Sequence, residues 1–554
     1  MKLIECVPNI SEGRNKEIIN KIIDNLKSNK SIELLDHDIG YDTNRTVITF
    51  VGEPENVVNA ACQLIVDTYN LIDMSKHKGA HPRMGATDVC PLIPISNVTV
   101  KECIQYSKNL AKKVSEKIDI PIYLYEKSAS NDDRKNLAFI RSGEYEAIKT
   151  KLKTPEWKPD FGSSIFNKKF GCVAIGCREF LLAYNINLNT SNKKIATDIA
   201  LDIREMGRLK RDKDGVVIRR KDGIAERVPG KFKYCKAVGW FIDEYNQAQV
   251  SINLTNYKKT SLHKVFDEVR NQARKRGVRV TGSEIVGLIP FKAIYDSGIY
   301  YLKKQNSQLG LPVVDIINTA VHSLGLNDIY DFNIDEKIIE RKISKKSHFP
   351  SMKINEFIKS ISRPTPTPGG GSVAALGGSI GASLSAMVSN LSIPKKGLEK
   401  HINFHNDRAI KCQKNINELL LLIDKDSNSY DRVIKANRLP GKTSEQIKTK
   451  TKELLIATKH AADIPLKVLT LCNAVLSDSL DIAKNCNINS ISDIAVAGEF
   501  LKASAYSASY NVRINIQDLP KNDKVKYLDS IDYHLKDIEH LYLNLINVCN
   551  ENLN

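Results

Sequence analysis

The chain of 554 residues lacks the cysteine pattern of a disulfide-bonded or zinc-binding protein. Its 11 cysteines include no Cys-x-x-Cys pair, and the closest two, Cys172 and Cys177, are too few to form a structural zinc site. Several others occupy apolar helical positions, where free cysteine behaves as a small hydrophobic residue. We therefore expect free thiols, a reducing cytoplasmic environment and no bound metal.

Long hydrophobic runs are also scarce. Residues 372–393 form an uncharged stretch that nearly reaches the length of a membrane span. Gly, Ala and Ser dominate this stretch, and these residues gain little by moving into lipid. The composition therefore predicts a buried helix with closely packed small faces. The opening residues, MKLIECVPNISEG, predict a strand and a polar turn rather than a signal peptide.

Acidic residues are outnumbered by basic ones, with 64 Asp and Glu against 82 Lys and Arg and a formal net charge of +18. Nucleic acid is one candidate partner, but the sequence has no RNP, helix-turn-helix or zinc-finger pattern. A basic site for a small polyanion is the competing interpretation, and the motifs described below favour it. The length indicates about three or four compact units of a soluble globular protein.

The pattern of elements divides the chain into three parts. Residues 1–180 and 181–341 each predict the order β-α-β-β-α-β, so we expect an α+β fold of two tandem ferredoxin-like subdomains with a cleft between them. Residues 342–350 are typical of a linker. Helical periodicity dominates residues 351–554, which predict an all-α helical bundle. A surface hairpin is expected at residues 211–228.

One loop, HKGAHPRMGATD at residues 77–88, concentrates proton carriers between glycines and a proline. We interpret His81 as a general base tuned by Arg83, Asp88 or His77, because an unperturbed histidine pKa of about 6.5 suits proton transfer near neutral pH. The alternative is a histidine that caps a turn. The two histidines also suggest zinc, but the glycine and proline between and beside them disfavour the helix that would align the rings.

Polar residues flank the turn between two predicted strands. The segments Asp36–Asp38 and Asn44–Thr46 fit a turn with Asx hydrogen bonds. Alternatively, Arg45 at the start of a strand binds a substrate carboxylate in bidentate fashion. The candidate substrate-binding residues of this region are Asp38, Asn44, Arg45 and Arg83.

The segment TPTPGGGS at residues 365–372 is a second candidate site. Its prolines stiffen the chain and its glycines let the backbone approach an anionic group at a helix N-terminus, although a plain helix start is the alternative. It matches neither common nucleotide-binding glycine pattern. Downstream, Asp426 either lies on a solvated helix face or points into the bundle as an acid–base group. The candidate substrate-binding residues here are Pro368, Gly369, Gly370, Gly371 and Ser372.

Two loops combine glycine with aromatic residues, Phe161–Gly171 and Val228–Phe232. Glycine lets backbone N–H groups approach a planar ring, on which the aromatic side chains could stack. Each pattern alone is more typical of a plain loop.

Together these segments resemble a known family. Five of them resemble glutamate formiminotransferases: CVPNISEGR (6–14), TNRTVITFVG (43–52), IDMSKHKGAHPRMGATDVCPLIP (72–94), FLLAYNINL (180–188) and GSEIVGLIP (282–290). Two resemble formiminotetrahydrofolate cyclodeaminases: PTPTPGGGSVAALGGSIGASLSAMVSNL (364–391) and LLIDKDSNSY (421–430). Their order resembles the bifunctional formiminotransferase-cyclodeaminase family over nearly the whole chain.

The resemblance implies a two-step folate reaction in histidine degradation, without a metal. N-formimino-L-glutamate passes its formimino group to N5 of tetrahydrofolate, and the product then cyclises to 5,10-methenyltetrahydrofolate with release of ammonia. The resemblance also implies a polyglutamylated cosubstrate and a homo-oligomeric ring of dimers. It assigns the catalytic roles to His81 and Asp426. It assigns folate contacts to Gly162, Ser163, Ser164, Ile165, Phe166, Asn167, Lys168, Lys169, Phe170, Gly171, Gly230, Lys231 and Phe232.

Two alternatives remain open at this point. One is a single-activity glutamate formiminotransferase whose helical part serves assembly only. The other is a basic scaffold that binds nucleic acid or filaments. Local departures from the family pattern are Ser75 and Ala80, where more polar residues are expected, and the long hairpin at residues 211–228 beside a folate-contacting turn.

Overall fold

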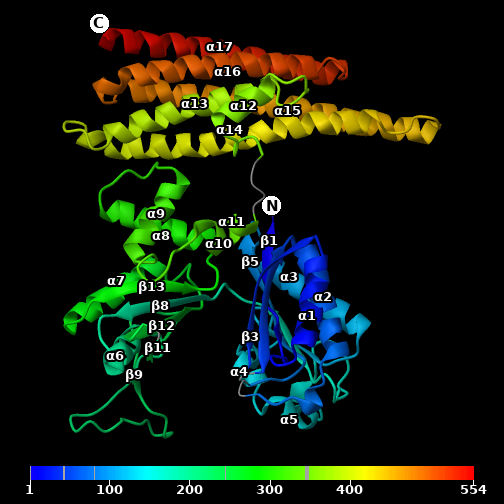
Figure 1. The fold of residues 1–554 in the computed structure, drawn as a ribbon, viewed down its shortest axis with the longest axis vertical. Coiled ribbons are helices and arrows are strands. Elements are labelled where there is room, and N and C mark those ends of the chain that lie inside the picture. Colours follow the sequence, from blue (N-terminus) through cyan, green and yellow to red (C-terminus); the bar gives the residue numbers. More distant parts are fainter. Residues whose placement is uncertain (1, 42–43, 80–81, 244, 344–347, 554) are drawn as a thin grey trace. The chain divides into compact units, whose positions relative to one another are not determined.

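The computed structural model describes residues 2–41, 44–79, 82–243, 245–343 and 348–553. The chain forms two compact units. The first comprises Met1–Ile294 with Leu324–Ile343, and the second comprises Tyr295–Ser323 with Ser344–Asn554. Mixed α/β structure followed by a mostly helical part confirms the predicted fold class (Figure 1).

The first unit contains a seven-stranded mixed sheet. β1 and β2 both lie between β4 and β5, with β3 on the outer side of β4. Beyond β5, β7 and then β6 continue the sheet in parallel pairings. The strands are β1 (Leu3–Cys6), β2 (Asn9–Ile10), β3 (Ile32–Gly40), β4 (Arg45–Gly52), β5 (Thr87–Ser96), β6 (Ile122–Glu126) and β7 (Val173–Cys177).

Three helices cover one face of this sheet: α1 (Lys16–Ser28), α2 (Pro54–Leu71) and α3 (Val100–Lys117). Their apolar sides form one core with Ile48 and Phe50 of β4, both fully buried. Because successive strand residues point to opposite faces, Arg45, Val47 and Thr49 point to the other face, which we call the open face. Two short helices, α4 (Leu137–Ile140) and α5 (Glu144–Lys151), pack on the same side as the open face through a smaller core.

A second sheet in the first unit is antiparallel, in the order β11-β12-β8-β13. Helices α6 (Lys193–Ile203) and α7 (Leu262–Lys275) pack against it. The predicted surface hairpin is present, with exposed residues between β9 (Arg208–Leu209) and β10 (Arg227–Val228). The sheet strands are β8 (Leu182–Leu188), β11 (Cys235–Ile242), β12 (Gln247–Leu254) and β13 (Val280–Val286). The helices that follow are α8 (Phe291–Lys304), α9 (Val313–Leu324), α10 (Ile334–Lys337) and α11 (Ile339–Ile343), and most of α8 and α9 belongs to the second unit.

The second unit is built around α13 (Gly370–Ser392), which packs against α14, α15 and α16. Among the residues that the structure describes, α13 is the one helix long and apolar enough to cross a membrane, and most of it is buried inside the unit. This agrees with the buried small-residue helix expected from its composition. The other helices after residue 350 are α12 (Ile354–Ile361), α14 (Ile402–Asn437), α15 (Ser444–Ala483), α16 (Ile491–Asn515) and α17 (Lys521–Leu553).

Candidate active sites

The loop that contains the predicted general base joins α2 to β5. His81 itself lies outside the described residues. Before it, Nε2 of His77 lies 2.8 Å from the backbone oxygen of Asn44, and Nδ2 of Asn44 donates to the backbone oxygen of Lys78 at 3.0 Å. The side-chain oxygen of Asn44 accepts from the backbone N–H of Gly13 at 2.9 Å. Asn44, predicted as substrate-binding, therefore uses both ends of its amide to fix this loop.

His77 is held in one tautomer. Nε of Arg83 donates to its Nδ1 at 3.4 Å, so Nε2 carries the proton that His77 donates to the oxygen of Asn44. Burial, followed by the positive charge of Arg83, lowers the pKa of His77, while the hydrogen bond to Asn44 raises it. His77 is thus a neutral ring that positions the loop.

Arg83 is buried and already paired. It contacts Glu144 at 2.7 Å and forms a bidentate pair with Glu146 through hydrogen bonds of 2.9 and 2.7 Å. The hydrogen bond to Glu146 is the main reason that the pKa of Arg83 is raised. Its predicted contact with substrate would have to compete with these two carboxylates, which belong to α5.

The predicted residues Asp38 and Arg45 lie together on the open face. Asp38 of β3 and Asn9 of β2 pair with Val47 of β4 from opposite sides. Paired residues point to the same face of a sheet, so the side chains of Asp38 and Asn9 lie on the open face with those of Val47 and Arg45. Nη2 of Arg45 donates to the side-chain oxygen of Asn9. The open face therefore carries a polar patch at the end of the sheet where the loop of residues 77–88 enters β5.

A bulge in β5 adds a carboxylate to this patch. Asn9 pairs with Val89 whereas Ile10 pairs with Thr87, which leaves Asp88 as the extra residue. Thr87 bonds to Thr68 of α2 on the helix side, and the bulge turns Asp88 to the open face. There Asp88, with a side chain only 2% exposed, accepts from the backbone N–H of Met84 at 2.9 Å and from Nη2 of Arg141.

Sequence reasoning missed Arg141. It follows α4 as the capping residue, in a short polar segment that has no periodicity and no motif of its own. Only the pairing with Asp88, 53 residues away in the chain, brings it to the patch. No signal in the sequence alone points to this contact.

The predicted folate loop, residues 162–171, docks against the segment that follows His81. Gly171 pairs with Gly85, and a side chain at either glycine would collide with the opposite backbone, at 2.1 Å for Gly171 and 2.0 Å for Gly85. Asn167 caps the turn, because its side-chain oxygen accepts from the backbone N–H of Lys169 at 3.0 Å and of Phe170 at 2.9 Å. The structure thus brings this loop next to the described part of the loop that contains the predicted general base.

The loop also presents an aromatic group. The Phe166 ring lies 5.7 Å from the Tyr145 ring, and Ile165 is 72% exposed. Phe170 is instead fully buried against Tyr69, which makes it part of the core rather than a surface for stacking.

Gly230–Phe232 lies in the other subdomain. The backbone N–H groups of Lys231 and Phe232 donate to the end of α6 at 2.8 and 3.0 Å, and the Lys231 ammonium pairs with Glu268. Among the described residues, no hydrogen bond or ion pair joins this segment to residues 162–171.

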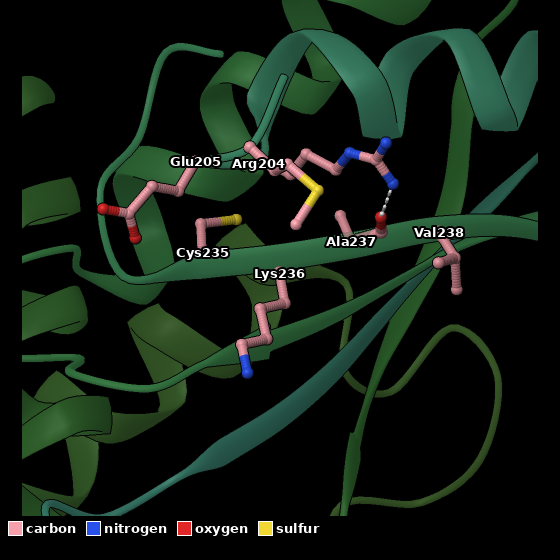
Figure 2. A pocket seen from close by; sticks show the side chains of 7 residues that line it. Arg204, Glu205, Cys235, Lys236, Ala237 and Val238 are labelled. Carbon is pink, nitrogen blue, oxygen red and sulfur yellow. Dashed lines mark hydrogen bonds between the residues drawn. The ribbon is translucent and has the colours of Figure 1, made fainter. Parts of the chain in front are cut away.

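Beside Gly230–Phe232 is a cavity of about 550 Å³ between the end of α6 and β11 (Figure 2). Met206, which is 61% exposed, and Cys235 give it an apolar lining, and Nη1 of Arg204 donates to the backbone oxygen of Ala237 at 3.4 Å. Arg204, Glu205 and Lys236 also line it, but most of the surface that they and their neighbours present to the cavity is apolar.

A smaller cavity of about 250 Å³ lies over the open face, next to Val47 and Thr49. Glu5 of β1 lines it and is 3% exposed, and burial raises the pKa of this carboxyl to about 7 even though Arg178 opposes the shift. The segment around residues 286–288 forms the opposite wall. This cavity continues the surface that begins at Arg45, two strand positions away from Val47.

The second unit places Asp426 against the start of α13. The Ser372 hydroxyl, which has one proton to donate, lies 3.1 Å from Oδ2 of Asp426 and 3.0 Å from the backbone oxygen of Ile423, both of which accept. A side chain at Gly371 would lie 2.2 Å from Oδ1 of Asp426, so only glycine admits this carboxylate. The predicted glycine turn and Asp426 therefore form one site.

Burial raises the pKa of Asp426, while hydrogen bonds from the side chain and backbone of Ser372 oppose the shift. Such a carboxyl is poised to hold a proton nearer neutral pH than a solvated aspartate does. Asn511 of α16 lies beside Gly370, about 3.1 Å from where a side chain at that glycine would begin, and adds a polar group that sequence reasoning did not single out. Pro368 and Gly369 precede this turn.

Metal ligands are not assembled in the part of the chain that the structure describes, where no group of three or more His, Cys, Asp and Glu side chains could hold an ion. His405, for example, is fully buried and its Nε2 lies 2.9 Å from the backbone oxygen of Asn485.

Comparison with known families gives three matches along the chain. Residues 3–178 match the formiminotransferase domain, N-terminal subdomain, residues 183–344 match the formiminotransferase domain, and residues 353–530 match the formiminotransferase-cyclodeaminase family.

Characterised proteins give the same result. The chain is 39% identical to a formimidoyltransferase-cyclodeaminase of Dictyostelium discoideum, over 93% of both chains. It is 40% identical to a glutamate formimidoyltransferase of Streptococcus pyogenes serotype M1, over 55% of this chain and 95% of that protein. It is 33% identical to a methenyltetrahydrofolate cyclohydrolase of Methylorubrum extorquens, over 30% of this chain and 80% of that protein.

Proposed function

This chain belongs to the formiminotransferase-cyclodeaminase family, and from that premise we propose that His81 and Asp426 move the protons of its two reactions. The protein is a bifunctional folate enzyme. It transfers the formimino group of N-formimino-L-glutamate to N5 of tetrahydrofolate, and it cyclises the product to 5,10-methenyltetrahydrofolate with release of ammonia.

In the first reaction His81 serves as the general base. N5 attacks the amidine carbon, N5 loses a proton, and the glutamate nitrogen gains a proton as its bond to carbon breaks. One imidazole can perform both transfers in sequence. The support for this assignment is the polar patch of Asn9, Arg45 and Asp88 beside the described part of the same loop. Arg45 binds a carboxylate of the donor.

In the second reaction Asp426 is the acid–base group. N10 attacks the formimino carbon and loses its proton, and the nitrogen that leaves as ammonia gains a proton as its bond to carbon breaks. The observation that carries this proposal is the position of the Asp426 carboxyl at the N-terminus of α13, beside Ser372 and the space left by Gly371. Burial raises its pKa, which favours a carboxyl that holds and then delivers a proton.

The cosubstrate is polyglutamylated tetrahydrofolate, whose anionic tail suits the net charge of +18. Residues 162–171 and 230–232 contact it. The chain acts in the cytoplasm, where its 11 cysteines, all free, are stable as thiols. It assembles as a homo-oligomer, a ring of dimers, to which the exposed apolar residues Val373, Ile380 and Met387 of α13 could contribute a contact.

Two variants test whether His81 and Asp426 serve separate reactions. His81→Ala is expected to abolish formimino transfer and leave ammonia release from 5-formiminotetrahydrofolate unchanged, and Asp426→Asn is expected to do the reverse. Transfer is measured as glutamate formation, and cyclisation as the absorbance of the methenyl product together with ammonia release. Loss of both activities in either folded variant would contradict two separate sites. No ammonia release by the wild-type protein would favour a single-activity transferase.

A further inference from the structure

Two arginines from distant parts of the chain lie on the polar patch of the open face. Arg45 is the first residue of β4 and is held through Nη2 by Asn9, a neutral acceptor. Arg141 follows α4 and is held through Nη2 by Asp88 at the bulge of β5. Because Asn9 and Asp88 belong to adjacent strands that pair with each other, both guanidinium groups are anchored side by side on the sheet.

Both arginines have hydrogen-bonding capacity to spare. The Nε atoms of Arg45 and Arg141 are buried, and neither has a hydrogen-bond partner in the part of the chain that the structure describes. A buried donor left without an acceptor costs about 1–3 kcal/mol, and more when the group is charged. Such orphaned donors are rare in folded proteins unless a ligand or water completes them.

The charges around Arg45 and Arg141 also indicate a place for an anion. Within the described residues Arg45 has no carboxylate at ion-pair distance, and Arg141 has one, Asp88. Burial and the nearby positive charge of Arg141 lower the pKa of Arg45, whereas Asp88 and Asp38 partly offset this effect. Two like charges in a half-buried position are stabilised by an anion that sits between them.

Arg134 of the first unit shows the contrasting case of a buried arginine with paired donors. Arg134 is also buried, but its guanidinium donates to Asp160 at 2.9 Å and to the backbone oxygens of Glu156 and Lys158 at 3.0 and 2.8 Å. Arg134 therefore provides a matched example of an arginine whose role is to hold the fold.

We propose that Arg141 and Arg45 together form a clamp for one carboxylate of N-formimino-L-glutamate, with Asp88 as the positioning residue that aims Arg141. The proposal rests on the proposed function of this site and adds a binding residue to it. Two planar guanidinium groups match a carboxylate by paired N–H···O bonds, which a lysine in either position could not reproduce. The donor is a dicarboxylate, so a fixed carboxylate would orient its amidine carbon relative to the loop of residues 77–88.

The test is steady-state transfer by Arg141→Ala, Arg141→Lys and Asp88→Asn in the full chain. Loss of charged hydrogen bonds predicts a KM for N-formimino-L-glutamate raised about 10- to 100-fold in Arg141→Ala, with the KM for tetrahydrofolate and the rate of ammonia release from 5-formiminotetrahydrofolate unchanged. Arg141→Lys keeps the positive charge but loses the paired N–H donors of the guanidinium group, so a KM between those of the wild type and Arg141→Ala is expected. Asp88→Asn is expected to raise the same KM by a smaller factor.

Donor analogues identify the carboxylate. N-formiminoglycine lacks the side-chain carboxylate, and 4-(formiminoamino)butyrate lacks the α-carboxylate. With the analogue that lacks the carboxylate bound by the arginines, the wild type and Arg141→Ala should have equal kcat/KM. With N-formimino-L-glutamate, added guanidinium ion should restore part of the kcat/KM that Arg141→Ala has lost. Arg134→Lys, as the control, should lower the melting temperature without a donor-selective change in KM.

Three results would overturn the clamp. An unchanged KM for N-formimino-L-glutamate in folded Arg141→Ala would exclude a contact with the donor. A rise in KM for polyglutamylated tetrahydrofolate instead would assign the arginines to the folate tail. An equal loss with every donor, accompanied by a lower melting temperature as in Arg134→Lys, would make the role structural. All three results leave formimino transfer by the wild-type protein intact and so contradict the clamp alone. Absence of transfer by the wild-type protein would instead contradict the proposed function.

Discussion

Gly371→Ala is a sharp test of the site in the second unit. The added methyl group would lie 2.2 Å from Oδ1, 2.6 Å from Cγ and 2.7 Å from Oδ2 of Asp426, all below the 3.0 Å that real Cβ atoms respect. Either the carboxylate or the start of α13 must therefore move by about 1 Å. A displacement of that size at a reacting group costs about 100-fold in rate, equivalent to about 2.7 kcal/mol.

The fold should tolerate the same change. Alanine favours a helix more than glycine does, so the first turn of α13 gains intrinsic helix stability. We expect the rate of ammonia release to fall about 100-fold while formimino transfer and the melting temperature stay near those of the wild type. Stopped-time ammonia assays and thermal unfolding of the full chain measure these quantities.

A matched control is Gly441→Ala in the same unit. The nearest atom to a side chain at Gly441 is 3.8 Å away, so no group must move. This variant should retain both activities. Ammonia release by Gly371→Ala at the wild-type rate would refute the argument that Asp426 and the helix start form one catalytic site.

Two further predictions concern the first unit and the assembly. Because the folded-state pKa of Glu5 is raised from 4.5 to about 7, the folded protein binds the extra proton between these values, so wild-type stability falls as pH rises through that window and stays lower above it. Glu5→Gln should remove this loss. Its unfolding free energy, measured by urea titration, should exceed that of the wild type by about 3 kcal/mol above pH 7 and equal it below pH 4.5. The same pH dependence of unfolding free energy in both proteins would contradict this prediction. Sedimentation of the full chain should detect a homo-oligomer, and a stable monomer would contradict the assembly.

Local patterns were enough to predict the elements that carry the sites. The periodicity of residues 1–341 indicates two α+β subdomains because strand and helix periods are short-range properties. Glycine clusters at residues 369–371 and at Gly85 and Gly171 mark close approach of backbone or carboxylate, and the structure gives the reason at each. The charged segment that contains Asp426 left two interpretations open, and burial of the carboxyl beside Ser372 decides for the inward one.

Long-range contacts lay beyond such patterns. The sequence offered His77 and Arg83 as groups that tune His81, and Arg83 also as a substrate-binding residue. In the structure His77 donates to Asn44 as a neutral ring, and Arg83 pairs with two glutamates of α5. Phe170 looked suited to stack on a ring but lies in the core. In each case a partner tens of residues away changes what the side chain can do.

The sequence by itself determined the family and the order of the subdomains and predicted two centres of chemistry, because these depend on contiguous motifs and on local periodicity. Only the tertiary structure decided which charges are matched. The bulge at Asp88 turns an extra carboxylate to the open face, Arg141 arrives there from another segment, and two guanidinium groups keep unsatisfied donors within the described residues. Burial and pairing set the free energy of a charged group, and both are properties of the folded chain rather than of any stretch of it.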